Sequence, residues 1–564
     1  MPAKQARRRR APSVEKTSGS STRAALEFLE RRGALVALAL TLVASIRIAA
    51  TYPVFNHTFD EPAHIACGLE YLDKGVYKLE PQHPPLARAA AALGAYLTGI
   101  RYPDHSDAPS PEFEMSGRGL AILYSGGHYD RTLMLARLAI LPFFWIACWV
   151  VYRWAKRYFG PAAAATAVFF FSFLPPVLAH AGLATTDMAL TAFLGAAFLA
   201  ALGWAENPTP LNAAWFGLAG ALAVLSKFSC LVFFPVCAGL ALLWYIIEDR
   251  PGAGALTRFA ARGIPGLCLA GAIAFSLVWA GYRFSFGKVD FTSVRLPFPE
   301  LYQGIKAVMQ HDKEGHLSYL LGKISMSGFW YYYPVVLAVK TPLGFLALAG
   351  TGVVLALRRR VALRQARLPL AFAAGILAVG FFSRINIGVR HILPVYIGLS
   401  IVAAAGAVRL LGDPRTRRWL RYGVLLAALW FAASSLLCHP DYLAYFNEFA
   451  GAEPEKILVD SDLDWGQDMK RLSQRLREIG ASEVYLALFA NAAFEREHGF
   501  PPSYQSLPDR PGPGWNAIGV SRWKLLRLGA GGNLNIPIWP DRARPVERVG
   551  RSILLYYFQP APRR

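Results

Sequence analysis

Apolar blocks, each roughly 18–20 residues long, recur along most of the chain and constrain its fold more than any other feature. A helix of that length crosses the hydrocarbon core of a bilayer, which is about 30 Å thick. Charged residues make up only 17% of the 564 residues, against about a quarter in a soluble domain. The sequence therefore predicts a mainly α-helical polytopic membrane protein, with about eleven spans near residues 34–51, 131–152, 161–179, 188–204, 212–225, 228–247, 264–282, 333–357, 368–383, 391–408 and 419–437.

The basic residues indicate how these spans are oriented. The net charge is +22, and most of the basic residues lie in short loops between apolar blocks, as the positive-inside rule requires of cytoplasmic loops. We therefore attribute the charge to topology and to anionic lipid contact, and expect no nucleic-acid partner. The Arg7–Arg10 run places the N-terminus in the cytoplasm, and alternation then predicts five cytoplasmic loops, four of them basic: 153–158, 206–210, 248–263, 358–367 and 409–421.

This topology divides the chain into three parts. Residues 1–33 are expected to be a basic, disordered cytoplasmic tail, and residues 34–438 a transmembrane domain with long outer loops at 52–130 and 283–332. Residues 439–564 are less apolar and alternate strand-like and helix-like pieces, so we expect a small extracytoplasmic α/β domain there. Its predicted pieces are KILVDS, DMKRLSQRLREIG, VYLALFA and RSILLYYF. The six cysteines show no spacing typical of a zinc site or a disulfide framework.

A pair of carboxylates, Asp60 and Glu61, follows the first span within a few residues. A carboxylate at a membrane-facing cavity can act as a general base. Alternatively, Thr58 and the two acids form the start of a helix, with an N-cap and acidic residues in the first turn. Capping does not require His64, which lies four residues after Asp60 on the same helix face.

Four segments together resemble the GT-C glycosyltransferases: DEPAHIACGLEYLDKGVYKLEPQHPPLARAA, GHLSYLLGKISMSGFWYYYPVVLAVKTPLG, INIGVRHILPVYIG and ILVDSDLDWGQDMKRL. The resemblance is to family 39, the dolichyl-phosphate-mannose–protein mannosyltransferase-like enzymes, and to the related bacterial aminoarabinose transferases. It implies a GT-C fold with about 11–13 transmembrane helices in the cell inner membrane. It also implies inverting transfer of a monosaccharide from a polyprenyl-phosphate donor to a protein hydroxyl or an envelope glycolipid at the outer face.

The resemblance assigns roles to both acids of the pair. Asp60 matches the catalytic acidic position and would act as the base, while Glu61 matches the second acid and would orient the acceptor or a metal ion. Asp187, at the start of the fourth span, would share the same cavity, although the Thr185-Thr186-Asp187 run is also typical of a helix cap.

A lipid phosphate at this depth requires cations on the outer side. The candidates are Arg47, Lys227, Lys340, Arg384 and Arg390. For each of them the alternative is snorkelling of a long basic side chain to the lipid headgroups. The residues predicted to bind substrate are His64, His83, Asp187, Lys227, Lys340 and Arg390.

A divalent metal ion is an open expectation, since some members of the resembled group use one. His64, His83, His316 and His391 are all placed on or near the outer side, but scattered imidazoles define no metal site. Asp460, Asp462 and Asp464 alternate like the start of a calcium loop. Trp465 and Arg471 stand where an EF-hand needs glycine and glutamate, so we reject that interpretation.

A transporter or flippase of a lipid-linked substrate is the alternative class, since it would also place charge at outer helix ends. Transporters are commonly built from repeats with broken helices at the membrane midplane. The sequence shows no internal repeat, and its candidate residues gather on one side of the membrane. These two features favour the glycosyltransferase interpretation.

Overall fold

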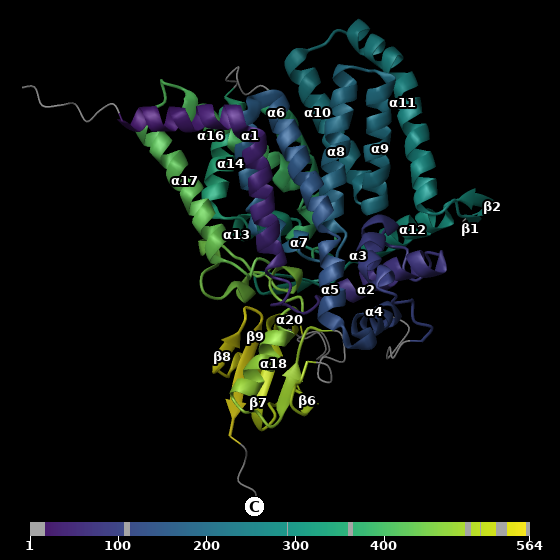
Figure 1. Ribbon diagram of the computed structural model, residues 1–564, viewed down its shortest axis with the longest axis vertical. Helices are drawn as coiled ribbons and strands as arrows, with labels where there is room; N and C mark the ends of the chain where they lie inside the picture. Colours follow the sequence, from purple (N-terminus) through teal and green to yellow (C-terminus); the bar gives the residue numbers. More distant parts are fainter. Residues whose placement is uncertain are drawn as a thin grey trace, which may run out of the picture.

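The computed structural model describes residues 17–105, 113–289, 292–358, 365–490, 498–507, 509–525 and 538–559. A large helical bundle forms most of the molecule, and a small α/β domain built from the C-terminal part of the chain lies at one end of it (Figure 1). The long helices are α1 (Thr17–Ala49), α6 (Leu141–Ser172), α8 (Asp187–Glu206), α9 (Pro210–Ser226), α10 (Cys230–Asp249), α11 (Ala253–Gly281), α14 (Leu343–Leu357), α15 (Arg367–Phe382), α16 (Val395–Gly412) and α17 (Arg418–Leu437).

Not every predicted span becomes a helix that is long and apolar enough, by length and composition alone, to cross a membrane. Seven helical segments of the described ranges are long and apolar enough to cross a membrane. The count rises to eight if α13 (Tyr332–Lys340) and α14, which meet at 117°, form one broken span. Pro342 explains this break, because proline cannot continue the helical hydrogen-bond ladder. The predicted spans at 212–225 and 368–383 become α9 and α15, helices of 17 and 16 residues that are shorter than a typical span.

One further boundary agrees with the sequence prediction and one differs. The segment Tyr129–Ser172 is broken at Gly160, where φ is 87° and ψ is 172°, so its two parts correspond to the predicted spans 131–152 and 161–179. Helix α1 begins at Thr17, so the prediction of a disordered tail over residues 1–33 is wrong for residues 17–33. Alanine, leucine, glutamate and arginine are strong helix formers, and they extend the apolar helix toward the N-terminus. Residues 1–16 lie outside the described ranges.

The outer segments carry short elements that cover one end of the bundle. The first contains α2 (Glu61–Leu69), α3 (Pro85–Leu97), α4 (Glu114–Tyr124) and the start of α5 (Tyr129–Leu138). Helices α2 and α3 approach closely at Gly68, where a Cβ would lie 1.9 Å from the carbonyl oxygen of Arg88. The second contains the hairpins β1–β2 (Phe286–Val289, Thr292–Pro297) and β3–β4 (Ser318–Leu320, Lys323–Ser325), with α12 (Pro299–Glu314) between them.

The C-terminal domain has a mixed five-stranded sheet in the order β6-β5-β7-β9-β8. Strands β5 and β6 and strands β5 and β7 pair in parallel, whereas β9 pairs antiparallel to β7 and β8. Helix α18 packs Met469, Leu472 and Leu476 against the sheet. The strands are β5 (Val484–Ala487), β6 (Ser503–Gln505), β7 (Gly514–Gly519), β8 (Glu547–Val549) and β9 (Ile553–Phe558), and the helices are α18 (Met469–Glu478) and α20 (Val520–Leu525).

The predicted α/β character of this domain is confirmed, but one of its predicted strands is absent. The KILVDS stretch forms short 3-10 turns at Pro454–Lys456 and Asp460–Asp462 instead of a strand. Its backbone bonds outside the sheet: the Ile457 carbonyl accepts from Leu321 N at 2.9 Å, and Asp460 N donates to Ser521 Oγ at 2.7 Å. The segment therefore joins the domain to the bundle.

The N-terminal end of α1 and the C-terminal domain lie at opposite ends of the bundle (Figure 1). We predict that a membrane-impermeant maleimide labels Lys456→Cys, but not Arg415→Cys, in intact cells, because the C-terminal domain is expected outside. Both residues are exposed in the structure. Cys268 and Cys438 would first be changed to serine, and both positions should react after permeabilisation. Labelling of Arg415→Cys alone in intact cells would reverse the predicted orientation.

Candidate functional site

Polar side chains from distant parts of the chain meet where the bundle contacts the C-terminal domain. The segment before α2 is joined to the loop before α18 by backbone and side-chain hydrogen bonds. Phe59 N donates to the Trp465 carbonyl at 2.9 Å, and the Asn56 side chain bonds to Gly466 O and Met469 N, both at 2.7 Å. These bonds hold Asp60 at the boundary between the two parts of the molecule.

Asp60 forms an ion pair with Arg390, although 330 residues separate them in the sequence. Arg390 Nη1 donates to Asp60 Oδ2 at 2.8 Å, and its guanidinium lies 4.2 Å from the centre of the Trp465 ring. Arg390 Nε is buried and has no hydrogen-bond partner among the described residues. The Asp60 side chain is 30% exposed and makes no capping hydrogen bond, so capping does not explain its presence.

Asp187 and Lys227 form a second ion pair at the same end of the bundle. Lys227 Nζ donates to Asp187 Oδ1 at 2.7 Å. Asp187 is the first residue of α8, and Lys227 directly follows α9. The other oxygen, Asp187 Oδ2, is buried without a hydrogen-bond partner in the described part of the chain. Lys227 thus pairs with a buried acid, which disfavours the snorkelling alternative.

The charges of the Asp60–Arg390 and Asp187–Lys227 pairs shift the pKa values of Arg390 and of a third acid, Asp460. Burial alone would lower the pKa of Arg390, but the Asp60, Asp187 and Asp460 carboxylates raise it above its ordinary value. Burial raises the pKa of Asp460 to about 7, with Arg390 opposing the rise and Asp60 adding to it. Asp460 also has a positive φ of 58°, a strained conformation of the kind that clusters at functional sites.

Two neutral imidazoles border this cluster. Burial lowers the pKa of His180 to about 3, with Asp187 opposing the shift and Arg390 adding to it. The pKa of His391 lies well below its ordinary range, because of burial first and of Lys227 and Arg390 second. Both rings can therefore donate or accept hydrogen bonds without adding positive charge.

Glu61 is placed differently from its neighbour. Its side chain is fully buried and forms a double ion pair with Arg137, at 2.9 and 2.8 Å. It also accepts from Thr58 N at 2.7 Å and Ala184 N at 2.9 Å. Burial would raise the pKa of Glu61, but Arg137 and these hydrogen bonds lower it below its ordinary value. Glu61 therefore fixes α2 against α5 and the loop before α8, and its role in orienting an acceptor or a metal stays a prediction.

His64 and His83 lie together around a buried arginine that the sequence analysis did not single out. Arg88 Nε donates to His64 Nδ1 at 3.0 Å, and Arg88 Nη1 donates to the Glu80 carbonyl at 2.8 Å. Arg88 also pairs with the Glu80 carboxylate, and its Nη2 lies 3.3 Å from His83 Nδ1. The sequence feature that could have pointed to Arg88 is that it is the one charged residue in the alanine-rich LARAAAALGAYL segment. The network adjoins the site, because the charge of Asp187 raises the pKa of His64 and the charge of Lys227 lowers the pKa of His83.

Three of the predicted cations are occupied elsewhere. Lys340 is 1% exposed and donates to the carbonyls of Leu443 at 2.8 Å and Asp462 at 2.5 Å, contacts that are structural, while its phosphate-binding role stays a prediction. Arg47 donates to Ser435 and lies over the Phe173 ring. Arg384 is exposed and donates to the Lys313 carbonyl at 3.4 Å.

The acidic run after Asp460 accepts backbone hydrogen bonds. Asp462 Oδ1 accepts from Val389 N at 3.0 Å, and Asp464 Oδ2 accepts from Ser521 N at 2.9 Å. Both acids are buried, and they attach this loop to Arg390's own turn and to the C-terminal domain. In the described ranges, no three His, Cys, Asp or Glu side chains are grouped so as to hold a metal ion.

This arrangement defines a polytopic membrane protein with the GT-C fold, as the sequence predicted. ArnT from Cupriavidus metallidurans bound to undecaprenyl phosphate is similar in structure, with a TM-score of 0.50 at 15% identity over 92% of this chain and 97% of that chain. Its apo form has a TM-score of 0.47 at 14% identity over the same shares. The Archaeoglobus fulgidus oligosaccharyltransferase has a TM-score of 0.42 at 14% identity, over 72% of this chain and 55% of that chain. No protein-family model and no curated protein sequence matches the chain.

Replacing Glu61 tests its structural role. Glu61→Gln leaves the buried Arg137 without its counter-ion, and we expect the free energy of unfolding to fall by about 3 kcal/mol. A lower melting temperature in detergent would show this loss, and the double variant Glu61→Gln/Arg137→Met should recover part of it. Glu27→Gln removes an exposed partner of Arg23 and should leave the melting temperature nearly unchanged. An unaltered melting temperature for Glu61→Gln would contradict this role.

Asp460 provides a test through pH. A native pKa of about 7, against 3.8 for an ordinary aspartate, means that the folded protein holds this proton more tightly than the unfolded chain. The resulting stabilisation is complete below about pH 4 and is lost as the pH rises through 7. The melting temperature of Asp460→Asn should therefore fall less than that of the wild type between pH 5 and pH 8. Parallel curves would disprove the shift, and Asp130→Asn serves as the exposed control.

Proposed function

We propose that this protein transfers a monosaccharide from a polyprenyl-phosphate donor to an acceptor, with inversion at the anomeric carbon. The reaction would take place at the outer face of the cell inner membrane, where the C-terminal domain is expected. The observation that carries this proposal is the pairing of Asp60 with Arg390 and of Asp187 with Lys227 at one end of the bundle. Asp187 Oδ2 and Arg390 Nε are buried there without hydrogen-bond partners among the described residues, so each keeps an unused acceptor or donor.

The two cations suit the leaving group. A departing polyprenyl phosphate gains negative charge as the sugar–phosphate bond breaks, and charge-assisted hydrogen bonds from Arg390 and Lys227 would stabilise it. Trp465 keeps the Arg390 guanidinium in place from one side. Both cations reside in a largely buried setting, where electrostatic interactions are stronger than in water.

Asp60 is the proposed general base. Its carboxylate is partly exposed, so an acceptor hydroxyl can reach it from water. The acceptor oxygen would attack the anomeric carbon opposite the phosphate, forming a new C–O bond while its proton passes to Asp60. The bond between the anomeric carbon and the phosphate oxygen would break, and its electron pair would leave with the polyprenyl phosphate. The acceptor would be a protein hydroxyl or an envelope glycolipid.

Two further points bear on the donor. The ArnT structure that shares this fold was solved with undecaprenyl phosphate, which supports a lipid-linked donor for this chain as well. A divalent ion stays an expectation from the resemblance to the glycosyltransferases. The described residues do not fit a divalent metal ion. They include no group of three suitable ligands, and the carboxylates of Asp60 and Asp187 are already paired with Arg390 and Lys227. No step of the proposed reaction passes through a metal.

The first experiment compares wild type with Asp60→Asn. Purified protein would receive a panel of radiolabelled polyprenyl-phosphate sugars, with membrane extract as the acceptor. We expect the transfer rate to fall by about 10²–10⁴-fold in the variant, because the base is lost, while donor binding persists. Glu453→Gln removes an ion-paired acid from the exposed surface and should transfer at the wild-type rate.

Two outcomes would contradict the proposal in different ways. Equal transfer by wild type and Asp60→Asn would remove Asp60 from the chemistry but keep the enzyme. No transfer by either protein, together with movement of sugar-lipid across proteoliposome membranes, would establish the transporter or flippase class instead.

A further inference from the structure

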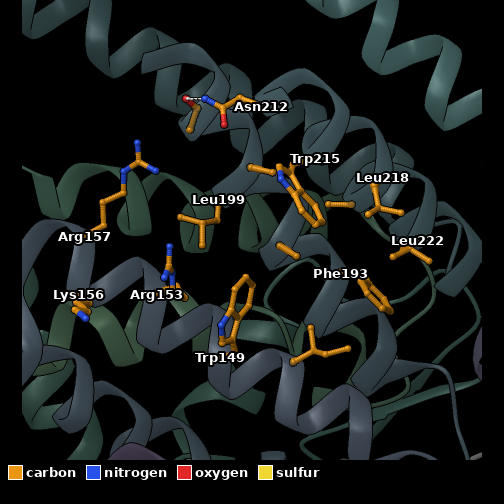
Figure 2. Close-up of a pocket in the computed structure, with 15 residues that line it drawn as sticks. Trp149, Arg153, Lys156, Arg157, Phe193, Leu199, Asn212, Trp215, Leu218 and Leu222 are labelled. Atoms are coloured by element: carbon orange, nitrogen blue, oxygen red, sulfur yellow. Dashed lines mark hydrogen bonds between the residues drawn. The ribbon is translucent and has the colours of Figure 1, made fainter. Parts of the chain in front are cut away.

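A groove opens between α6, α8 and α9, near the end of the bundle away from the C-terminal domain (Figures 1 and 2). Its volume is about 800 Å³. Figure 2 shows basic side chains of α6, among them Arg153 and Lys156, on one side, and Phe193, Leu218 and Leu222 on the other. The groove is separate from the Asp60 site, and nothing in the proposed reaction uses it.

The walls and floor of the groove are shaped for an aliphatic chain. Trp149 and Trp215 contribute large, half-exposed rings, and the small residues Ala196, Ala200 and Gly203 of α8 line it at one-turn and two-turn spacing. From Phe193 to Gly203 the helix rises roughly 15 Å. That length is about half of the 30 Å hydrocarbon core, so the groove matches the depth of a single leaflet.

The basic end of the groove carries charge that the protein does not neutralise. Arg157 is paired with Glu206. Arg153 lies over the Trp149 ring at 5.8 Å, and Lys156 lies over the Tyr152 ring at 5.7 Å. In the part of the chain that the structure describes, neither Arg153 nor Lys156 has a carboxylate within 4.0 Å. An apolar channel that ends at two uncompensated cations complements a lipid with an anionic headgroup.

We propose that this groove binds one anionic phospholipid of the leaflet opposite the C-terminal domain. An acyl chain lies between Trp149 and Trp215, and the headgroup phosphate contacts Arg153 and Lys156. This inference does not depend on the proposed transferase activity.

The depth of the groove distinguishes this lipid from the proposed donor. Asp187 begins α8 at the polar site, and Gly203 lies 16 residues further along the same helix, a rise of roughly 24 Å. A phosphate held by Arg390 and Lys227 therefore cannot contact Arg153 at the same time. The groove requires a second lipid, with its headgroup on the other side of the membrane.

Lipid retention by the full-length protein tests the proposal. Detergent-purified protein would be incubated with radiolabelled phosphatidylglycerol or phosphatidylcholine, passed through a desalting column and counted. We expect about one phosphatidylglycerol per chain and little phosphatidylcholine. Arg153→Gln/Lys156→Gln should lose about tenfold or more of the phosphatidylglycerol, since each cation near a membrane surface contributes to anionic lipid binding. Ala200→Trp keeps the charge but fills the floor of the groove, and should lose a similar amount.

A matched control removes two exposed cations, Arg31 and Arg32, from α1. Arg31→Gln/Arg32→Gln should retain phosphatidylglycerol within about twofold of the wild type, and all variants should melt at the wild-type temperature. An equal loss of phosphatidylglycerol in this control would show that retention depends only on the total positive charge of the protein, and would overturn the proposal. Normal retention by Ala200→Trp would overturn it too, because the groove would then hold no chain. Displacement of the phosphatidylglycerol by equimolar undecaprenyl phosphate would assign the groove to the carrier lipid instead.

Discussion

The buried ion pair between Glu61 and Arg137 is the interaction on which the polar end of the molecule depends. Both side chains are almost completely buried, and each would be very costly without the other. Glu61 also accepts from Ala184 N, three residues before Asp187. One carboxylate thereby fixes the start of α2, which carries Asp60, relative to the start of α8, which carries Asp187. The relative positions of Asp60 and Asp187 follow from this single buried group.

The rest of the site is assembled on that frame by ion pairs between distant segments. Arg390 reaches Asp60 from the turn before α16, and Asp462 anchors that turn by accepting from Val389 N. The loop of Asp462 is itself attached to the C-terminal domain through Ser521. The C-terminal domain therefore has a structural task at the site, since it holds the loop that positions Arg390. Removing the domain would free one of the two cations.

The sequence predicted the parts of this structure that depend on local pattern. Apolar block length indicated the helical membrane domain, and the strand-like pieces VYLALFA and RSILLYYF indicated β5 and β9. The Asp60–Glu61 pair lies after the first span, at the end of the bundle that meets the C-terminal domain. The buried ion pair of Glu61 was not predictable from the residues alone, because neighbouring residues on a helix differ in direction by about 100° and only the tertiary contacts show which one is buried. Arg88 and Arg137 were missed for the same reason, since their partners lie in other helices and leave no local signal.

The cations of the Asp60 site differ from Arg153 and Lys156 of the groove in how their charge is compensated. At the polar end, every cation of the site faces a carboxylate, so the bundle keeps its charges compensated until a ligand shares them. At the other end, Arg153 and Lys156 have aromatic faces beside them but no carboxylate within 4.0 Å among the described residues, so an anion from outside the chain can compensate them. Paired charge suits a site that a substrate enters and leaves, because the empty state remains stable. Unpaired charge beside an apolar groove fits the proposed anionic lipid, because its headgroup would supply the anion that Arg153 and Lys156 lack among the described residues.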